Sequence, residues 1–358
     1  MNIEVLPLNE ANLKTPPTEE FGFGDKFSNR MFSQHYSPDE GWHDAKIGPF
    51  GPFSLSPATA VLHYAQEIFE GTKAYRREDG NINLFRPWEN MRRFNNSAKR
   101  MAMATVDEEE HLAAICKLVE LEQEWVPSKP GASLYIRPAM FGSDDALGVH
   151  ASKNYIHFVI IGPVGPYFKE GFNPVSVYIS DKYRRAVKGG VGDAKTGGNY
   201  AASLFVGEDA KQKGYSQVLW LDAIHGRYVE EVGAMNICFV YEGKKIVTPA
   251  LTGSILPGIT RKSVIELGRD LGYEVEEGTV DVDELVADIE SGKVTEAFGC
   301  GTAAVIAPVG KFGYKENEYI LNDYKSGPVA MHLYDELTGI QYGRIPDRFN
   351  WIHTIEVN

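Results

Sequence analysis

The sequence predicts a two-domain protein of mixed α and β structure, and three observations support that prediction. The chain has 358 residues, which at about 100–200 residues per domain is enough for two domains and a sizeable core. Strand-like and helix-like patterns occur in both halves, but they do not alternate strictly, so a simple doubly wound Rossmann sheet is not expected. No internal repeat or low-complexity tract is apparent, which argues against a solenoid.

Composition and charge argue against two classes of partner. Hydrophobic residues make up 43% of the chain and charged residues 24%, as in ordinary globular proteins. The formal net charge is −13, and so acidic a chain lacks the basic surface that binding to nucleic acid requires. The longest apolar stretch, residues 155–164, is interrupted by Gly162 and Pro163 and is too short to span a bilayer. We therefore expect no nucleic-acid partner and no membrane association.

Cysteine and histidine spacing predict the compartment and the absence of a metal. Cys116, Cys238 and Cys300 lie far apart and form no C-x-x-C pair, which argues against a disulfide framework and favours a reducing cytosol. The N-terminal residues show no basic region followed by an apolar run, so no signal peptide is expected. The histidines lack the H-x-x-x-H spacing of a helical metal site. These patterns predict a cytoplasmic protein without a bound metal.

The chain begins with a region rich in glycine, proline and aromatic residues. Residues 1–60 are expected to form an extended arm with short strands. A strand-like run at 81–86 precedes Pro87, a residue that suits the first position of a helix. Apolar residues then recur at helical spacing over residues 88–103, which predicts an amphipathic helix.

A second helix and two strands are expected to complete the first half. Asp107, with Glu110 three residues later, predicts a capped helix start, and the helix is expected to run towards Trp125. The acidic run at this point is better explained as a solvated first helical turn than as a metal site. Residues 133–140 and 155–161 read as strands, the second nearly all apolar.

A stretch dense in glycine and proline, residues 162–174, lies near the middle of the chain and predicts the connection between domains. The expected division is a smaller N-terminal domain over residues 1–163, an interdomain loop over 164–174 and a larger C-terminal domain over 175–358. In the second half we expect strands near 175–180, 217–222, 238–241 and 297–298, and helices near 201–213, 260–271, 282–291 and 327–338.

The most informative segment is GGVGDAKTGGNY, residues 189–200. It resembles a phosphate-binding P-loop only superficially, because Ala194 stands where that motif requires glycine. The lysine is followed by Gly197 and Gly198, and not by the apolar helix start on which a P-loop depends. Nucleotide binding is therefore a weak alternative for this segment.

A second glycine-rich run, GCGTAA at residues 299–304, imitates the dinucleotide-binding fingerprint. That fingerprint requires a helix directly afterwards. Residues 305–308 read instead as strand or loop. The run could still offer open backbone N–H groups to a phosphate or a carboxylate.

Lys195 has a second interpretation, as an amine nucleophile. Flanking glycines allow a planar cofactor to approach the backbone, and a lysine partly removed from water loses its charge readily. Such a lysine can form a Schiff base with the aldehyde of pyridoxal 5'-phosphate (PLP). Glu230 and Glu231 offer an acid for the pyridine nitrogen, and Tyr200 offers a hydroxyl near the lysine. The alternative is an ordinary surface lysine in a flexible loop.

These motifs, taken together, resemble those of the branched-chain amino-acid aminotransferases, a family of class IV, fold-type IV, PLP-dependent enzymes. The resemblance implies a mixed α/β fold of two domains, the larger one a pseudo-barrel. It covers most of the chain through ordered segments, which are HYAQEIFEG (63–71), RPWENMRR (86–93), LYIRP (134–138), the lysine segment, EVGAMN (231–236), LPGITR (256–261) and GCGTA (299–303).

The resemblance implies a role for each residue around the cofactor. Lys195 would carry PLP as an internal aldimine and move the proton between the substrate Cα and the cofactor. Glu231 would hold the pyridine nitrogen protonated, and Tyr200 would hydrogen-bond the ring oxygen. Arg93 would grip the phosphate, although from the residues alone Arg92 is an equal candidate.

Further residues are implied at the phosphate and in the substrate pocket. Backbone N–H groups of Ile259 and Thr260 at a helix start would bind the phosphate, assisted by the Thr302 hydroxyl. Backbone amides of Thr302 and Ala303 would bind the substrate α-carboxylate. The implied pocket walls are Phe23, Tyr64, Phe69, Tyr135 and Val149, with Arg137 or Tyr135 as donor to the distal carboxylate of glutamate or 2-oxoglutarate.

The resemblance thus implies ping-pong transfer of an amino group between L-leucine, L-isoleucine or L-valine and 2-oxoglutarate, as in branched-chain amino-acid biosynthesis. It implies a homodimer in which Val149 reaches the partner's site. A D-amino-acid aminotransferase or an aminodeoxychorismate lyase of the same fold type is the alternative. The chain departs from relatives at Ala234, where many have threonine, and it lacks the C-x-x-C of eukaryotic members after the Gly-Thr-Ala segment.

Overall fold

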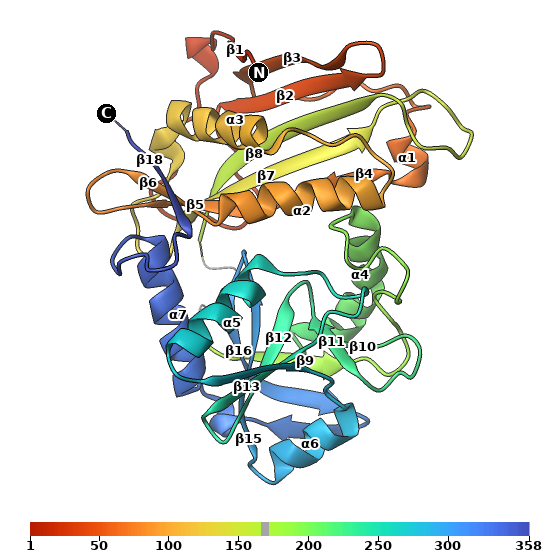
Figure 1. The fold of residues 1–358 in the computed structure, drawn as a ribbon, viewed down its shortest axis with the longest axis vertical. Helices are drawn as coiled ribbons and strands as arrows, with labels where there is room; N and C mark the ends of the chain where they lie inside the picture. Colours follow the sequence, from red (N-terminus) through yellow and green to blue (C-terminus); the bar gives the residue numbers. More distant parts are fainter. Residues whose placement is uncertain (166–171, 358) are drawn as a thin grey trace. The chain divides into compact units, whose positions relative to one another are not determined.

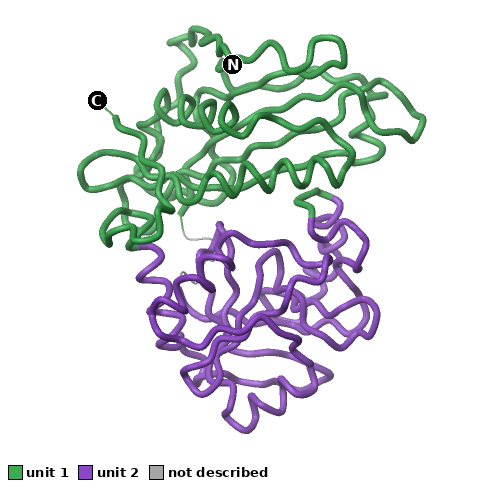
Figure 2. The backbone as a smooth tube through the Cα atoms, viewed as in Figure 1, with its two compact units in different colours: residues 1–167, 194–197, 339–358 green, residues 168–193, 198–338 purple. Residues whose placement is uncertain are grey.

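The computed structural model describes residues 1–165 and 172–357, and its internal contacts divide the chain into two units (Figure 2). Unit 1 comprises Met1–Tyr167, Ala194–Gly197 and Gly339–Asn358. Unit 2 comprises Phe168–Asp193 and Gly198–Thr338. Most of the predicted interdomain loop, residues 166–171, lies outside the described residues.

Unit 1 is built on one nine-stranded sheet, most of whose strand pairs are antiparallel (Figure 1). The path of hydrogen-bonded neighbours is β1 (Glu4–Val5), β3 (Gly41–Pro49), β2 (Arg30–Ser37), β8 (Tyr155–Val164), β7 (Ser133–Gly142), β5 (Thr72–Arg76), β6 (Ile82–Phe85) and β18 (Ile352–Ile355). Strand β4 (Glu67–Phe69) pairs with β7 outside this path. The predicted central strand, β8, does lie inside the sheet, between β2 and β7.

The first 60 residues contain strands, as expected, but β2 and β3 belong to the sheet and do not form an extended arm with short strands. Strands β2 and β3 have 8 and 9 residues and pair with each other in an antiparallel hairpin. Strand β2 also pairs along its length with β8. Glycine and aromatic residues obscured the alternating pattern by which a strand is recognised in a sequence, and long-range pairing with β8 outweighs weak local propensity.

Helices α2 (Pro87–Arg100) and α3 (Glu108–Leu121) belong to unit 1, together with the short α1 (Val61–Tyr64) and two 3₁₀ helices at Glu10–Asn12 and Gln123–Trp125. Pro87 is the first residue of α2, as predicted. The Asp107 carboxylate caps α3 by accepting a hydrogen bond from the Glu110 N–H at 2.9 Å. The local signals therefore predicted both helix starts correctly.

Unit 2 contains a second nine-stranded sheet. Its path is β11 (Val229–Val232), β10 (Gln217–Leu221), β9 (Val175–Ile179), β16 (Val305–Tyr314), β15 (Val294–Gly301), β12 (Asn236–Tyr241), β13 (Lys245–Pro249) and β14 (Glu274–Gly278), with β17 (Asn317–Ile320) paired to β16. Parallel and antiparallel pairs are mixed in this sheet. The prediction of a sheet other than a simple doubly wound one is therefore confirmed.

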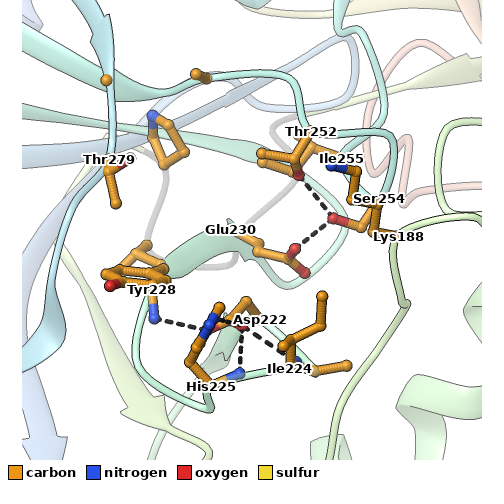
Figure 3. Close-up of a pocket in the computed structure, with 15 residues that line it drawn as sticks. Lys188, Asp222, Ile224, His225, Tyr228, Glu230, Thr252, Ser254, Ile255 and Thr279 are labelled. Carbon is orange, nitrogen blue, oxygen red and sulfur yellow. Dashed lines mark hydrogen bonds and ion pairs between the residues drawn. The ribbon is translucent and has the colours of Figure 1, made fainter.

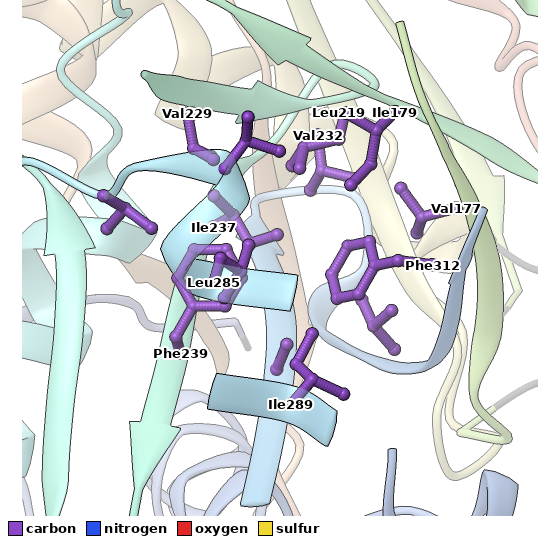
Figure 4. Packing of buried hydrophobic residues seen from close by; sticks show 14 of the residues in the cluster. Val177, Ile179, Leu219, Val229, Val232, Ile237, Phe239, Leu285, Ile289 and Phe312 are labelled. Atoms are coloured by element: carbon purple, nitrogen blue, oxygen red, sulfur yellow. The ribbon is translucent and has the colours of Figure 1, made fainter. Parts of the chain in front are cut away.

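The helices of unit 2 accompany this sheet. They are α4 (Gly197–Gln212), α5 (Ile259–Asp270), α6 (Val282–Glu290) and α7 (Pro328–Gln341), with a 3₁₀ turn at Asn322–Tyr324. The first residue of α4, Gly197, and the end of α7 from Gly339 onwards are assigned to unit 1. Figure 4 shows part of the core, in which Phe239, Phe312 and Leu285 pack with aliphatic side chains. Burial of this apolar area is the main force that holds the unit together.

Two segments that were predicted to lie in the C-terminal domain belong to unit 1. The four residues around Lys195, Ala194–Gly197, are contacted chiefly by unit 1, and the chain returns to unit 1 at Gly339. This return ends in β18, which pairs with β6 in antiparallel register. Unit 1 therefore holds more residues than unit 2, whereas the sequence predicted the smaller domain at the N-terminus. Within the described residues, no helix has the length and apolar character that crossing a membrane would need.

Candidate active site

The lysine segment is held against strand β4 in unit 1. The Phe69 N–H donates to the Lys195 carbonyl at 3.0 Å, and the Thr196 hydroxyl donates to the Glu67 carbonyl at 2.7 Å. From the other side, the Ser97 hydroxyl of α2 accepts the Lys195 N–H at 2.9 Å. The backbone of Lys195 is thus fixed by hydrogen bonds to two elements, so its side chain starts from a defined position.

Five residues that the sequence predicted for the site form a continuous row of contacts in unit 1. The Lys195 Nζ lies 5.1 Å from the ring centre of Phe69. The Arg137 guanidinium lies 4.6 Å from the same ring and donates to the Tyr135 hydroxyl at 2.9 Å. The ring of Tyr135 meets that of Phe23 edge to face, with centres 5.4 Å apart. An apolar wall with one cation in it therefore extends from the lysine.

Gly71 makes room for this row. A Cβ atom at position 71 would overlap the Tyr135 hydroxyl and ring, because both lie well inside van der Waals distance of that point. Glycine is therefore required at this position because the Tyr135 side chain lies close to the backbone.

Arg93 is anchored by a buried acid. Its Nε donates to Glu70 Oε1 at 2.7 Å and its Nη2 to Glu70 Oε2 at 2.9 Å, a bidentate geometry. Asn90 Nδ2 donates to the same carboxylate at 2.8 Å, and the Gly71 N–H at 3.0 Å. Although burial raises the pKa of Glu70, the Arg93 charge and hydrogen bonds hold it below its ordinary value. The carboxylate therefore stays ionised and orients the guanidinium.

Arg92 and Arg93, which the sequence alone could not distinguish, have different surroundings in the structure. The Arg92 side chain is 59% exposed and lies 3.7 Å from Glu89 on the same helix. The Arg93 side chain is 8% exposed and faces Glu70. Neighbouring helix positions point in different directions, about 100° apart, so only one of the two can face inward.

The two consecutive acids of β11 in unit 2 also have different surroundings. Glu231 forms an ion pair with Arg185 and accepts a hydrogen bond from Asn236 Nδ2 at 3.2 Å. Glu230 accepts a hydrogen bond from the Ser254 hydroxyl instead. Side chains alternate between faces along a strand, and the two carboxylates accordingly have separate partners.

Glu230 lines a pocket of about 360 Å³ whose walls include Lys188, Thr252, Ser254 and Tyr228 (Figure 3). Its Oε2 has no hydrogen-bond partner among the described residues and is covered from solvent. Burial raises the pKa of this carboxyl, while the Ser254 hydrogen bond and the Arg185 charge lower it. The surroundings of Glu230 thus favour its neutral form, and the two acids of β11 are not equivalent.

Asn236 joins two of the sequence motifs in unit 2. Its Nδ2 donates to Glu231 and also to the Leu256 carbonyl at 3.0 Å. A Cβ atom at Gly258 would collide with Asn236 Oδ1. The glycine is followed by Ile259 and Thr260, the first residues of α5, whose N-cap is Gly258 without a side-chain cap. The predicted helix start therefore exists in unit 2, and phosphate binding by its first backbone N–H groups stays a prediction.

The remaining predicted residues lie in turns and on helix α4. Thr302 and Ala303 form the hairpin turn between β15 and β16, and β16 begins at Val305, as a strand and not the helix of a dinucleotide site. Tyr200 is half-buried in the first turn of α4. The Tyr64 hydroxyl donates to the Leu147 carbonyl, and Val149 is 84% exposed.

One argument against a P-loop is wrong. Helix α4 begins at Gly197, directly after Lys195 and Thr196, and not near residue 201. The two glycines are tolerated there because the first N–H groups of a helix need partners outside it, and Glu67 accepts the Gly197 N–H. The replacement of glycine by Ala194 still separates this segment from the P-loop pattern.

Sequence reasoning missed four residues that support the site, namely Glu70, Ser97, Arg185 and Asn236. Glu70 and Asn236 lie inside motifs that the sequence analysis quoted, but no role was predicted for them. Each is polar and mostly buried, and each holds a predicted residue by a hydrogen bond or ion pair. Their roles become visible only when the fold shows which side chains they contact.

The chain is similar to known proteins over almost all of its length. Residues 67–312 match the model of the family described as amino-transferase class IV. A protein of Staphylococcus aureus (strain N315), named "Probable branched-chain-amino-acid aminotransferase", is 51% identical over 343 residues, 96% of this chain and 95% of that protein. The "Branched-chain-amino-acid transaminase 1" of Bacillus subtilis (strain 168) is 48% identical and covers 96% of each chain.

Solved structures give the same result. The branched-chain amino acid aminotransferase of Thermobaculum terrenum in its PLP form has a TM-score of 0.74 at 25% identity, covering 93% of this chain and 100% of that one. The Escherichia coli branched-chain amino acid aminotransferase has a TM-score of 0.73 at 27% identity, covering 91% and 99%. The expected fold is thereby confirmed. The chain belongs to the class IV aminotransferases and, within them, to the branched-chain-amino-acid aminotransferase family.

Proposed function

We propose that this transaminase uses PLP to move an amino group between branched-chain L-amino acids and 2-oxoglutarate in a ping-pong reaction, with the cofactor attached covalently to Lys195 Nζ. The observation that carries the proposal is the row from Lys195 through Phe69, Arg137 and Tyr135. It places an amine next to an apolar wall that contains one cation. Relatives at about 50% identity that are named for this activity support it.

The donor set fits an anionic, aromatic cofactor. Arg93 offers a buried guanidinium that Glu70 orients, and the start of α5 offers the backbone N–H groups of Ile259 and Thr260. Both are suited to a phosphate. Glu231, held by Arg185, would bind the pyridine nitrogen, and Tyr200 and Thr302 would donate to the ring oxygen and the phosphate. Related structures contain pyridoxamine 5'-phosphate and N-(5'-phosphopyridoxyl)-L-glutamate.

PLP, when bound, supplies an electron sink that stabilises negative charge at the substrate Cα. Once the substrate amino group has displaced it from the cofactor, Lys195 Nζ would take the proton from the substrate Cα as general base and donate it to the cofactor carbon as general acid. The ion pair with Arg185 and the hydrogen bond from Asn236 orient the Glu231 carboxylate, so that it can keep a proton on the ring nitrogen. Fixed dipoles of this kind need no reorganisation during the reaction.

The substrate pocket must accept both an apolar side chain and a carboxylate. Phe23, Phe69 and Tyr135 would contact the side chain of leucine, isoleucine or valine. Arg137 would pair with the distal carboxylate of glutamate or 2-oxoglutarate. Backbone amides of Thr302 and Ala303 would bind the α-carboxylate. Tyr64 and Val149 complete the proposed walls.

We propose a homodimer because Val149 is 84% exposed and Leu147, beside it, is 65% exposed. Large apolar side chains on one loop indicate a surface that is covered in the working protein. In the proposed dimer Val149 contributes to the partner's pocket. A cytoplasmic location follows from the proposed cofactor and metabolites.

The first test is chemical. Purified protein should be yellow, and reduction with borohydride should leave a pyridoxyl group on Lys195 in the peptide mass spectrum. Lys195→Ala should still bind PLP without a covalent bond but lose transamination. Absence of an adduct on this residue would reject the proposal.

The second test concerns the substrate. The ratio kcat/KM is to be measured for L-leucine, L-isoleucine, L-valine, aromatic L-amino acids and D-alanine with 2-oxoglutarate as acceptor. We expect the branched-chain substrates to be preferred. A preference for D-alanine would favour the alternative D-amino-acid aminotransferase.

A further inference from the structure

Glu67 contacts the lysine segment and stands two residues before Phe69, whose ring lies against Arg137, yet the proposed reaction assigns Glu67 no role. It is the first residue of β4 and is half-buried. Its Oε1 accepts a hydrogen bond from the Gly197 N–H, and its carbonyl accepts one from the Thr196 hydroxyl at 2.7 Å. The carboxylate therefore faces the chain just after Lys195.

Gly197 allows this close approach. A Cβ atom at position 197 would overlap Glu67 Oε1. The backbone N–H at the start of α4 favours a negative group. The backbone at Gly197 thus helps to fix the position of the Glu67 carboxylate.

Arg137 needs a compensating charge. Its guanidinium lies over the Phe69 ring at 4.6 Å and donates to the Tyr135 hydroxyl at 2.9 Å, and both of these partners are neutral. Its Nε is buried and has no hydrogen-bond partner in the described part of the chain. A partly buried cation in such surroundings is costly unless an acid lies near.

Glu67 supplies that acid through space. Glu67 and Phe69 lie on the same face of β4, and the Arg137 guanidinium lies 4.6 Å from the Phe69 ring. Burial raises the pKa of the Glu67 carboxyl above its ordinary value, and the Gly197 hydrogen bond and the Arg137 charge offset only part of that rise. The two side chains thus interact through space, without a direct ion pair among the described residues. An electrostatic interaction of this kind is reciprocal. A negative charge that favours the cation also reduces the attraction of that cation for a second carboxylate.

We propose that Glu67 is a specificity-determining residue, whose negative charge balances Arg137 and moderates the affinity of the pocket for dicarboxylic substrates relative to branched apolar ones. The inference rests on the proposed function, because it assumes that Arg137 receives the distal carboxylate. Without this charge the pocket would retain glutamate and 2-oxoglutarate more tightly than an enzyme with two kinds of substrate requires. The alternative is that Glu67 only fixes the start of α4.

The variant Glu67→Gln separates these roles. Its amide oxygen can still accept the Gly197 N–H, while the charge is removed. Binding of two unreactive probes, glutarate and 4-methylvalerate, is measured by titration calorimetry on the PLP-loaded protein. We expect the Kd of glutarate to fall about 3- to 10-fold and that of 4-methylvalerate to change less than about 2-fold. Equal shifts for both probes, or none, would overturn the inference.

Two controls complete the experiment. Glu78→Gln removes an exposed charge of unit 1 and should leave both Kd values unchanged. In an Arg137→Met background, Glu67→Gln should no longer change the ratio of the two Kd values, because the cation is gone. If the unmodified protein binds neither probe, the proposed function fails together with the inference. If it binds both and only the ratio stays constant in Glu67→Gln, the inference alone fails.

Discussion

Two buried carboxylate–arginine pairs, one in each unit, differ in which member anchors the other. In unit 1, Glu70 accepts hydrogen bonds from Arg93, Asn90 and the Gly71 backbone. The acid is the anchor there, and the proposed function uses the arginine. In unit 2, Arg185 donates to the Ser254 carbonyl at 2.6 Å and pairs with Glu231. The arginine is the anchor in that pair, and the proposed function uses the acid.

The difference teaches how a functional charge can be buried. A buried ion pair is stable only when its remaining donors and acceptors are also satisfied. In each pair the anchoring member is bound by further protein groups, and it holds the member assigned to the cofactor. Loss of the anchor should therefore cost more stability than loss of the group that it orients.

The largest effect is expected at Glu70. Glu70→Ala leaves the Arg93 guanidinium buried without its counter-charge, which should lower the free energy of unfolding by about 3–5 kcal/mol. Arg93→Ala should cost about 1–2 kcal/mol less, because Asn90 and the Gly71 N–H still bind the carboxylate. Urea unfolding of both variants measures the difference, with Arg92→Ala as the exposed control, expected within about 0.5 kcal/mol of the parent. Equal losses in Glu70→Ala and Arg93→Ala would contradict the anchor interpretation.

The corresponding reversal is expected in unit 2. Arg185→Met should lower the free energy of unfolding by about 2–4 kcal/mol, because it removes the cation that pairs with the buried Glu231 carboxylate. Glu231→Gln should cost less, since the Ser254 carbonyl still accepts from Arg185. Lys182→Met, at an exposed position, is the control. A larger loss in Glu231→Gln than in Arg185→Met would show that the two pairs work alike.

Low pH should lower the stability of unit 1 through two buried histidines, His111 and His157. Burial lowers the pKa of the His111 imidazole to about 3, and burial together with His111 lowers that of His157. Their rings lie 4.5 Å apart. Stability from the neutral rings is present above the ordinary pKa of 6.5 and is lost as the pH falls towards the folded value.

Between pH 7 and pH 5 we expect His111 to contribute about 2 kcal/mol of this loss. Unfolding curves over that range are compared with those of His111→Gln, which cannot take up the proton and should show a smaller slope with pH. An unchanged slope would mean that the acid sensitivity arises elsewhere.

The smallest effect distinguishes the two neighbouring acids of β11. Glu230→Gln should raise the free energy of unfolding at pH 7 by about 0.5–1 kcal/mol, because burial already disfavours its charge and the amide can still accept from Ser254. The gain should disappear as the pH falls to the ordinary carboxyl range, where Glu230 is neutral in both states. Destabilisation at pH 7 would show that its charge is needed.

Local sequence signals predicted those features that depend on neighbouring residues. Pro87 and the pair Asp107 and Glu110 mark helix starts because they act within one turn. The strand at β8 was expected from its apolar run. The first 60 residues were misjudged because β2 becomes a strand by pairing with β8, more than 100 residues away.

For the candidate site, the sequence proposed the residues that would contact cofactor and substrate, but not the residues that hold them. The motifs and the family resemblance proposed Lys195, Arg93, Glu231 and the pocket walls. Glu67 and Glu70 lay inside a quoted motif without a role, because their partners are Gly197 and Arg93. Arg185 and Ser97 lay outside the reasoning altogether. A side chain that acts by holding another is recognised only when both positions in space are known.

The sequence by itself determined the family and the order of the motifs, since these depend on which chemical groups are present and how they follow one another. The tertiary structure decided which of two adjacent arginines and which of two adjacent acids is held by a buried partner. It also decided that the segment around Lys195 and the last strand belong with unit 1. The reason is physical, because burial and pairing are properties of groups brought together from distant parts of the chain.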